Sequence, residues 1–144
     1  MSTEKKSILF LCTGNSCRSQ MAEGWSRVLG GEKWLVRSAG IETHGLNPLA
    51  VRAMADVGID ISGQFSKLVS DLDRQDFDYV ITVCDYAAEQ CPVFPGPAQR
   101  IHKSFADPPI LASSAVSEDE PLVFYRQVRD EIGSFVKEFL QQKG

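Results

Sequence analysis

Residues 7–19, with the sequence SILFLCTGNSCRS, decide the fold. The first six of them form a short and almost continuously apolar run, which is typical of a strand that is buried on both faces. Residues 13–16 have the composition of a turn, and Met21, Trp25, Val28 and Leu29 then recur at helical spacing. The stretch therefore predicts a buried β-strand that leads through a tight loop into a helix.

The same alternation of strand and helix continues along the chain. Strands are predicted over residues 34–39, 79–84 and 100–103. Helices are predicted over residues 21–29, 47–57 and 85–91, with a last helix that begins between residues 117 and 121. Strands that alternate with helices indicate right-handed βαβ units and a parallel sheet covered on both faces, which is the α/β class. The length of 144 residues predicts a single domain, residues 1–144.

The composition narrows the classes of function. A formal net charge of −4 argues against bulk binding to nucleic acid and against anchoring to anionic lipid. No apolar run approaches the ~20 residues of a membrane span, and no secretory signal begins the chain, so we expect a cytoplasmic protein. Four cysteines in such a protein are not expected to form structural disulfides, which leaves metal binding, catalysis, redox chemistry or plain burial.

Residues 12–19 have the properties of an anion-binding loop. They lie between the first strand and a helix N-terminus, where backbone N–H groups and the helix dipole favour a tetrahedral oxyanion. Arg18 can add a bidentate contact, while the same field is expected to lower the pKa of Cys12 and make it a nucleophile, with Ser19 as a hydrogen-bond donor to the thiolate. The residues expected to bind the oxyanion are Thr13, Gly14, Asn15, Ser16, Cys17 and Arg18.

The loop resembles the phosphate loop of the low-molecular-weight protein tyrosine phosphatase superfamily. Residues 12–25 (CTGNSCRSQMAEGW) resemble still more closely the thioredoxin-coupled arsenate reductases on that fold, as do residues 38–45 (SAGIETHG), Cys84 with Cys91-Pro92, and residues 126–132 (RQVRDEI). The resemblance covers nearly the whole chain. It implies a three-layer domain in which helices flank a four-stranded parallel sheet, and an enzyme that reduces arsenate to arsenite in arsenic detoxification.

The resemblance also assigns a general acid or base. It makes Asp107 the carboxyl group that protonates a leaving oxygen above the anion loop. The phosphatases usually continue from this position with aromatic residues that hold a phosphotyrosyl ring, whereas here Pro109-Ile110 follows. This departure counts against an aryl phosphate as the substrate.

Three cysteines suit a redox relay. Reduction of As(V) to As(III) takes two electrons, which two thiols supply by forming a disulfide, and a third thiol exports that disulfide to an outside reductant. The proposed order is attack by Cys12 on arsenate, a Cys12–Cys84 disulfide, and then a Cys84–Cys91 disulfide that thioredoxin reduces. Seven residues of helix rise ~10.5 Å. Disulfide Cα atoms lie within ~7 Å of each other, so the segment between Cys84 and Cys91 must unwind.

Alternatives remain at this point. A phosphotyrosine or phosphomonoester phosphatase on the same fold needs only one thiol, and an oxyanion- or redox-sensing module needs no general acid. A mycothiol- or glutaredoxin-linked reductant could replace thioredoxin, which is carried over from the family. The spacings C-x4-C and C-x6-C are not those of a zinc site, so we expect no metal and no bound cofactor. We expect a monomer in which Cys17 packs behind the anion site.

Some relatives bind potassium beside the anion loop. Asn15 and Ser38 match two of the ligand positions in those proteins, but the threonine and aspartate that complete the site are replaced here by Phe65 and Lys67. Phenylalanine has no side-chain oxygen, and the Lys67 ammonium would repel the ion. We therefore expect Lys67 to occupy the place of the cation and support Asn15.

Overall fold

The computed structural model describes residues 5–89, 98–113 and 121–143, and its centre is a parallel sheet. Its four strands are β1 (Lys6–Cys12), β2 (Trp34–Gly40), β3 (Tyr79–Thr82) and β4 (Gln99–His102). They lie in the order β2-β1-β3-β4, and each neighbouring pair is parallel. The predicted α/β class with a four-stranded parallel sheet is confirmed.

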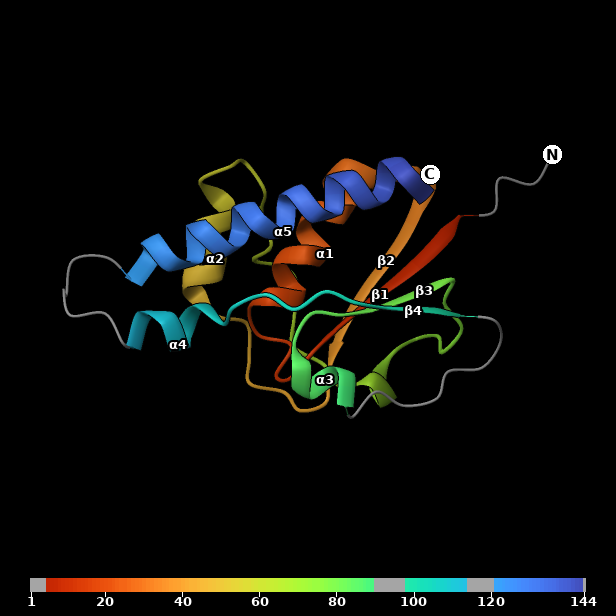
Figure 1. Ribbon diagram of the computed structural model, residues 1–144, viewed down its shortest axis with the longest axis horizontal. Coiled ribbons are helices and arrows are strands. Elements are labelled where there is room, and N and C mark those ends of the chain that lie inside the picture. Colours follow the sequence, from red (N-terminus) through yellow and green to blue (C-terminus); the bar gives the residue numbers. More distant parts are fainter. Residues whose placement is uncertain (1–4, 90–97, 114–120, 144) are drawn as a thin grey trace.

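Five α-helices flank the sheet. They are α1 (Arg18–Gly30), α2 (Pro48–Ala55), α3 (Asp85–Glu89), α4 (Pro108–Ser113) and α5 (Pro121–Lys143). Two short 3-10 helices, η1 (Gly31–Lys33) and η2 (Val69–Asp71), lie in the connections. In Figure 1, α1, α2 and α5 lie together on one side of the sheet. The short helix α3 lies against β1 and β3, near the ends where these strands stop (Figure 1).

Strand β1 forms the middle of the core. Ile8, Leu9 and Leu11 are completely buried, because β1 is paired with β2 on one edge and with β3 on the other and is covered by helices. This agrees with the prediction from its continuous apolar run. Because all four strands are parallel, their carboxyl ends meet at one edge of the sheet, where ligands bind in open α/β folds. Cys12 is the last residue of β1, and Cys84 follows the end of β3 by two residues.

The predicted elements are present, with shifted ends. Strand β3 stops at Thr82, two residues earlier than predicted, because the chain turns there into α3. The predicted helix over residues 85–91 is described only to Glu89, and Cys91 lies outside the described residues. Helix α4 is not among the elements that the sequence predicted. Proline at the first helical position after an aspartate is a helix-start signal, and it could have revealed α4.

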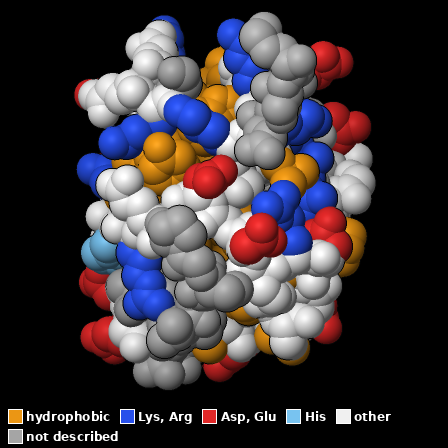
Figure 2. Space-filling view, turned by 90° about the vertical axis from the view of Figure 1, so that its right-hand side faces the viewer, with side chains coloured by type: hydrophobic (Ala, Val, Ile, Leu, Met, Phe, Trp, Pro, Cys, Tyr) orange, Lys and Arg blue, Asp and Glu red, His pale blue; other side chains and the backbone are white. Residues whose placement is uncertain are grey.

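The surface carries charges of both signs. Figure 2 shows a face on which Lys and Arg side chains are interspersed with Asp and Glu side chains, with small hydrophobic areas between them. No broad basic area of the kind that binds nucleic acid is seen on this face. Among the helices that the structure describes, none combines the length and the apolar character that a membrane span requires.

Asn47 supports a stability prediction. Its Oδ1 accepts a hydrogen bond from Leu49 N–H (2.9 Å) and caps α2, while its Nδ2 donates to Tyr125 Oη (2.9 Å) on α5. We expect Asn47→Ala to lower the free energy of unfolding by about 1–2 kcal/mol, because it removes the cap and leaves the tyrosine unpartnered. Asn47→Asp keeps the capping oxygen and should stay closer to the parent protein. Urea unfolding measures both, and equal losses for the two variants would contradict the capping role.

Candidate active site

Every backbone carbonyl oxygen of the anion loop, residues 12–17, accepts a hydrogen bond from a donor on the same side of the loop. The segment over residues 41–47 runs beside it and donates backbone N–H bonds to four of them, and residues of α1 fill the other two. The donors are Ile41 to Cys12 (3.2 Å), Glu42 to Thr13 (2.8 Å), His44 to Gly14 (3.0 Å), Gln20 Nε2 to Asn15 (3.0 Å), Asn47 to Ser16 (3.0 Å) and Met21 to Cys17 (2.9 Å). The opposite, N–H side of the loop is therefore left for an anion at the start of α1.

Two residues give the loop its shape. Asn15 has a positive φ of 48°, a conformation that asparagine tolerates better than most residues. Its Nδ2 donates to Ser19 Oγ (2.8 Å) and to Ser38 Oγ (3.0 Å). Gly14 lies against the ring of His44, and a Cβ atom at this position would meet that ring at 2.2 Å. The bonds made by the Asn15 side chain and the close contact of Gly14 with His44 thus fix the shape of the loop.

Arg18 and Asp107 lie together at the loop. Arg18 donates from one terminal nitrogen to the carbonyl oxygen of Phe105 (3.0 Å), and its other terminal nitrogen is 3.5 Å from Asp107 Oδ2. Arg18 Nε is buried and has no hydrogen-bond partner among the described residues. An oxyanion in the loop would give this N–H an acceptor, because a guanidinium presents Nε and a terminal nitrogen as a planar fork. The arrangement therefore brings a carboxyl group, a guanidinium and an anion-binding loop to one place.

The thiols of Cys12 and Cys84 lie beside this loop, close enough for each to shift the pKa of the other. Both side chains are buried, and Thr13 Oγ1 lies 3.2 Å from Cys84 Sγ. The neighbouring Cys12 thiol, acting with Thr13, the backbone of Ala87 and the Arg18 charge, lowers the pKa of Cys84 to about 5 against the effect of burial. The pair therefore carries one thiolate at neutral pH.

The negative charge of the pair lies on Cys84, whereas the sequence predicted it on Cys12. The neighbouring Cys84, together with burial, raises the pKa of Cys12, although the Arg18 charge and the backbone of Ser19 act in the opposite direction. The expectation of a lowered pKa for Cys12 is therefore wrong for this arrangement. The physical reason is that two adjacent sulfurs share one negative charge, so stabilising the thiolate on one of them keeps the proton on the other.

The other two cysteines have different surroundings. Cys17 is buried, and burial raises the pKa of its thiol to about 12, with the Asp107 charge contributing. This agrees with the packing role expected for its side chain. Cys91 lies outside the described residues. Within those residues, Cys12, Cys17 and Cys84 are free thiols.

The thiol pair predicts a titration that can be measured. In the reduced protein, one thiolate should form with a pKa of about 5, and absorbance at 240 nm against pH detects it. Cys12→Ala removes the largest cause of the lowered pKa and should move the transition toward neutral pH. Cys84→Ala should abolish it in this range. A transition that is unchanged in Cys84→Ala would show that a different thiol carries the charge.

Comparison with known proteins agrees with this geometry. Residues 7–143 match the family described as low molecular weight phosphotyrosine protein phosphatase. The chain belongs to that family. A protein of Bacillus subtilis (strain 168) called arsenate reductase is 51% identical over 138 residues, which cover 96% of this chain and 97% of that protein. A solved structure of an arsenate reductase in the oxidized state is 31% identical, with a TM-score of 0.77 over 96% of this chain and 99% of that chain. A thioredoxin-dependent arsenate reductase of Corynebacterium glutamicum shares the fold at 24% identity, with a TM-score of 0.73 over 96% of this chain and 60% of that chain.

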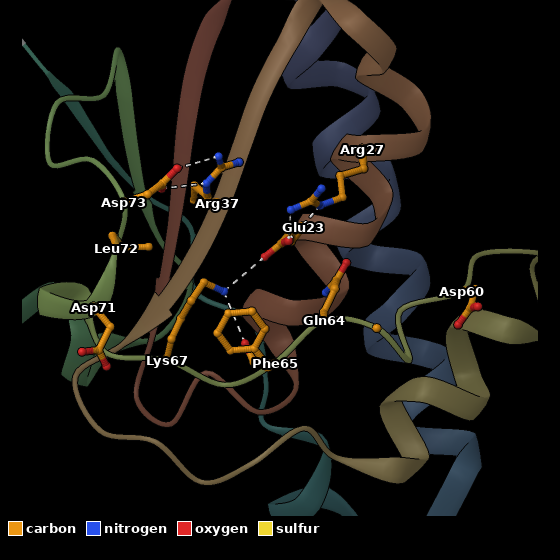
Figure 3. Close-up of a pocket in the computed structure, with 11 residues that line it drawn as sticks. Glu23, Arg27, Arg37, Asp60, Gln64, Phe65, Lys67, Asp71, Leu72 and Asp73 are labelled. Atoms are coloured by element: carbon orange, nitrogen blue, oxygen red, sulfur yellow. Dashed lines mark hydrogen bonds and ion pairs between the residues drawn. The ribbon is translucent and has the colours of Figure 1, made fainter.

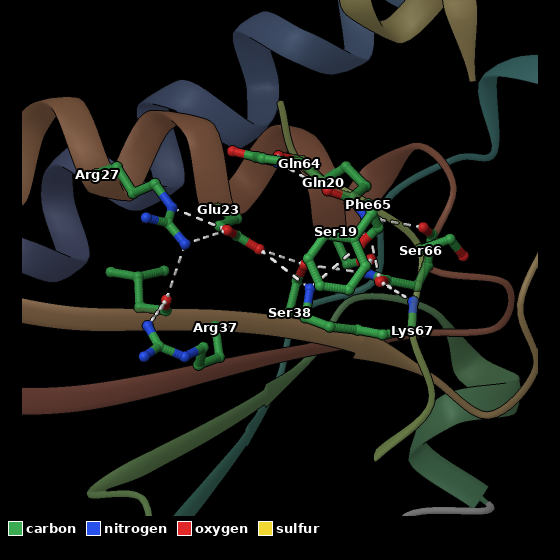
Figure 4. Close-up of polar contacts among 12 residues, drawn as sticks. Ser19, Gln20, Glu23, Arg27, Arg37, Ser38, Gln64, Phe65, Ser66 and Lys67 are labelled. Carbon is green, nitrogen blue, oxygen red and sulfur yellow. Dashed lines mark hydrogen bonds and ion pairs between the residues drawn. The ribbon is translucent and has the colours of Figure 1, made fainter. Parts of the chain in front are cut away.

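A network of polar contacts lies behind the anion loop. Glu23 is almost fully buried on α1, and its carboxylate accepts from Ser38 Oγ (2.5 Å), from Arg27 Nε (2.8 Å) and lies 3.8 Å from Lys67 Nζ. Figure 4 shows this chain of contacts, in which Ser38 in turn receives the bond from Asn15. Glu23 is a functional residue that the sequence did not predict. Its only signal was a glutamate beside apolar positions of the first helix.

Lys67 lies close to the buried acid and to the loop. Its backbone N–H donates to Asn15 Oδ1 (2.9 Å), and its ammonium donates to the carbonyl oxygen of Phe65 (3.3 Å). Burial lowers the pKa of Lys67, while the Glu23 charge raises it. The ammonium lies at one end of a pocket of about 440 Å³, which Figure 3 shows between α1, β2 and the segment that carries Lys67. Within the described residues, no group of three or more His, Cys, Asp or Glu side chains is placed to hold a metal ion.

The position of the Lys67 ammonium predicts that potassium has no specific effect on the protein. Because Lys67 already places a positive charge beside Glu23, thermal stability and activity should be alike in sodium and potassium salts at equal ionic strength. Thermal unfolding in the two salts measures this directly. A potassium-specific rise in the melting temperature would contradict the assignment. Lys67→Asp, which replaces the ammonium by an oxygen ligand, is the variant expected to gain a potassium response.

Proposed function

We propose that this chain reduces arsenate to arsenite through a relay of three thiols. The observation that carries the proposal is that two buried thiols, Cys12 and Cys84, lie side by side at a preformed anion loop, where Thr13 Oγ1 is 3.2 Å from Cys84 Sγ. A phosphatase needs one nucleophilic thiol, and a second one in contact with it suits the transfer of two electrons. The relatives that share about half of the sequence are called arsenate reductases, which supports the same reaction.

In the first step, Cys12 Sγ attacks the arsenic atom of an arsenate bound by the loop and Arg18. The proton of Cys12 passes to the neighbouring Cys84 thiolate, so the nucleophile becomes a thiolate only when the substrate is in place. Asp107, next to Arg18, protonates the oxygen that leaves as water. Ser19, which already receives a bond from Asn15, donates its hydroxyl hydrogen toward Cys12.

In the second step, Cys84 gives the proton that it received from Cys12 to an oxygen of the departing arsenite and attacks Cys12 Sγ as a thiolate. The sulfur–arsenic bond breaks, its electron pair stays on arsenic, and arsenite leaves as As(III) while the Cys12–Cys84 disulfide forms. Thr13 Oγ1, 3.2 Å from Cys84 Sγ, stabilises the attacking thiolate. Since the two thiols already touch, this step needs little movement of the backbone.

In the third step, Cys91 attacks Cys84, which frees Cys12 and leaves a Cys84–Cys91 disulfide. We propose thioredoxin as the reductant of that disulfide and the cytoplasm, where thiols stay reduced, as the compartment. The chain would act as a single domain and a monomer, without a bound cofactor. The part of α3 that separates the two cysteines has to unwind, because a disulfide cannot span it.

A phosphomonoester phosphatase is the second candidate, favoured by the family itself and by the Arg18–Asp107 pair at the loop. The residues after Asp107 are Pro108, Pro109 and Ile110, and Ile110 is mostly exposed. They provide no aromatic side chain to hold a phosphotyrosyl ring. We therefore expect only slow hydrolysis of small aryl phosphates, as a side reaction of Cys12.

Removal of single thiols tests the relay. With thioredoxin, its reductase and NADPH, the parent protein should oxidise NADPH only when arsenate is added, and glutathione with glutaredoxin should not replace thioredoxin. Cys84→Ser and Cys91→Ser should each abolish this turnover, yet retain slow hydrolysis of p-nitrophenyl phosphate, which needs only Cys12, Arg18 and Asp107. Cys12→Ser should lose both activities. Full arsenate turnover without Cys84 would exclude the relay.

A further inference from the structure

One imidazole contacts the residues on both sides of Cys84. His102, the last residue of β4, lies with Nδ1 2.8 Å from Thr82 Oγ1 and with Nε2 2.9 Å from Asp85 Oδ1. Thr82 is the last residue of β3, and Asp85 is the first residue of α3. The side chain therefore spans the turn that carries Cys84, from the end of the strand to the start of the helix.

The backbone beside His102 holds the same turn. Lys103 N–H donates to the carbonyl oxygen of Thr82 (2.9 Å), and Phe105 N–H donates to that of Val83 (3.1 Å). The carbonyl oxygen of Phe105 in turn accepts the bond from Arg18. One short segment thus connects the strand side of the Cys84 turn to the guanidinium of the anion loop, while the imidazole adds the connection to the helix side.

The bridge made by His102 survives a change of its charge. With a neutral imidazole, Thr82 Oγ1 donates to Nδ1, and Nε2–H donates to Asp85. With the imidazolium, Nδ1–H donates to Thr82 Oγ1, whose own hydrogen can turn to the carbonyl oxygen of Ile101, 3.5 Å away. In both states each ring nitrogen keeps a partner, because the threonine hydroxyl both donates and accepts.

Cys84 needs such support from outside its own helix. The described part of α3 is five residues long, which is too short to be stable by itself. In the proposed relay the same helix has to loosen so that Cys91 can reach Cys84. A contact from the rigid sheet to Asp85 keeps the first turn in place while Cys84 attacks Cys12, whichever conformation follows.

We propose that His102 is a positioning residue that holds Cys84 opposite Cys12 through its bonds to Thr82 and Asp85. The inference rests on the proposed relay. His102 acts on the formation of the Cys12–Cys84 disulfide, and it has no part in oxyanion capture or in the chemistry of Cys12 with a phosphate ester.

The exposure of the His102 and Asp85 side chains sets the size of the effect that we expect when His102 is removed. The side chain of His102 is 41% exposed and that of Asp85 is 79% exposed, so water competes for the bond between them. Pairs of this kind are weak, and we expect the loss of His102 to slow disulfide formation about two- to fivefold. An effect of this size is measurable as a rate and leaves folding intact.

The test uses the Cys91→Ser protein, in which the relay stops at the Cys12–Cys84 disulfide. Its rate of formation is measured in a single turnover with arsenate, and again with the thiol oxidant diamide, by acid quenching, alkylation and mass spectrometry. In this background, His102→Ala should slow both reactions about two- to fivefold. Hydrolysis of p-nitrophenyl phosphate and the melting temperature should stay at the values of the Cys91→Ser protein.

Conservative variants separate the two halves of the bridge. His102→Gln places an amide nitrogen near the position of Nε2 and should restore the bond to Asp85 and much of the rate. His102→Asn reaches only the position of Nδ1 and should behave more like His102→Ala. Arg126→Ala removes an ion pair with Asp56 of comparable exposure, far from the relay, and serves as the control that should change neither reaction.

Two results would overturn the proposal. One is disulfide formation in His102→Ala at the rate of its Cys91→Ser parent, with both arsenate and diamide. The other is an equal loss of disulfide formation and phosphate hydrolysis, which would indicate general damage to the loop. Failure of the proposed function gives a different pattern: the parent chain forms no disulfide with arsenate, while the diamide reaction still reports on His102.

Discussion

The anion loop depends on hydrogen bonds that occupy all its carbonyl oxygens from the outside. Six backbone carbonyls in a tight turn would repel an anion if any of them faced it, and each one is instead directed to a donor in the segment over residues 41–47 or in α1. That segment can lie there because β2 is the parallel neighbour of β1 and ends level with it, with Cys12 opposite Gly40. The arrangement of the sheet is therefore a direct cause of the electrostatics of the site.

The second constraint is that the site has two ionisable thiols but stabilises only one negative charge. Arg18 and the start of α1 favour a negative charge beside the loop, and two buried thiols compete for it. In this arrangement the thiolate lies on Cys84, and Cys12 keeps its proton. An oxyanion that occupies the loop changes this balance, because it adds negative charge next to Arg18. In the proposed reaction the nucleophile is then formed in the presence of its substrate.

The fold also separates the rigid elements that hold Cys12 and Cys84 from the segment after Cys84 that has to change conformation. Cys12 ends a strand whose last six residues are buried, and the Cys84 turn is bonded to β4 and to the segment that follows it. The residues between Cys84 and Cys91 begin with a five-residue helix, which is the weakest kind of regular structure. A relay needs this division, since the first disulfide forms between fixed sulfurs and the second requires a large displacement.

The sequence by itself determined the α/β class, the order of the strands and helices apart from α4, and the anion loop, with Cys12 and Cys84 at the carboxyl ends of strands and Arg18 at the start of a helix, since these follow from local periodicity and turn chemistry. It also placed Lys67 beside Asn15, by resemblance. It did not reveal the buried acid Glu23, the bridge from His102, or which thiol holds the charge. Those depend on atoms that are far apart in the chain: Glu23 meets Lys67 across 44 positions, and Cys12 meets Cys84 across 72. A pKa is set by neighbours in space and by burial, so only the tertiary structure decided it.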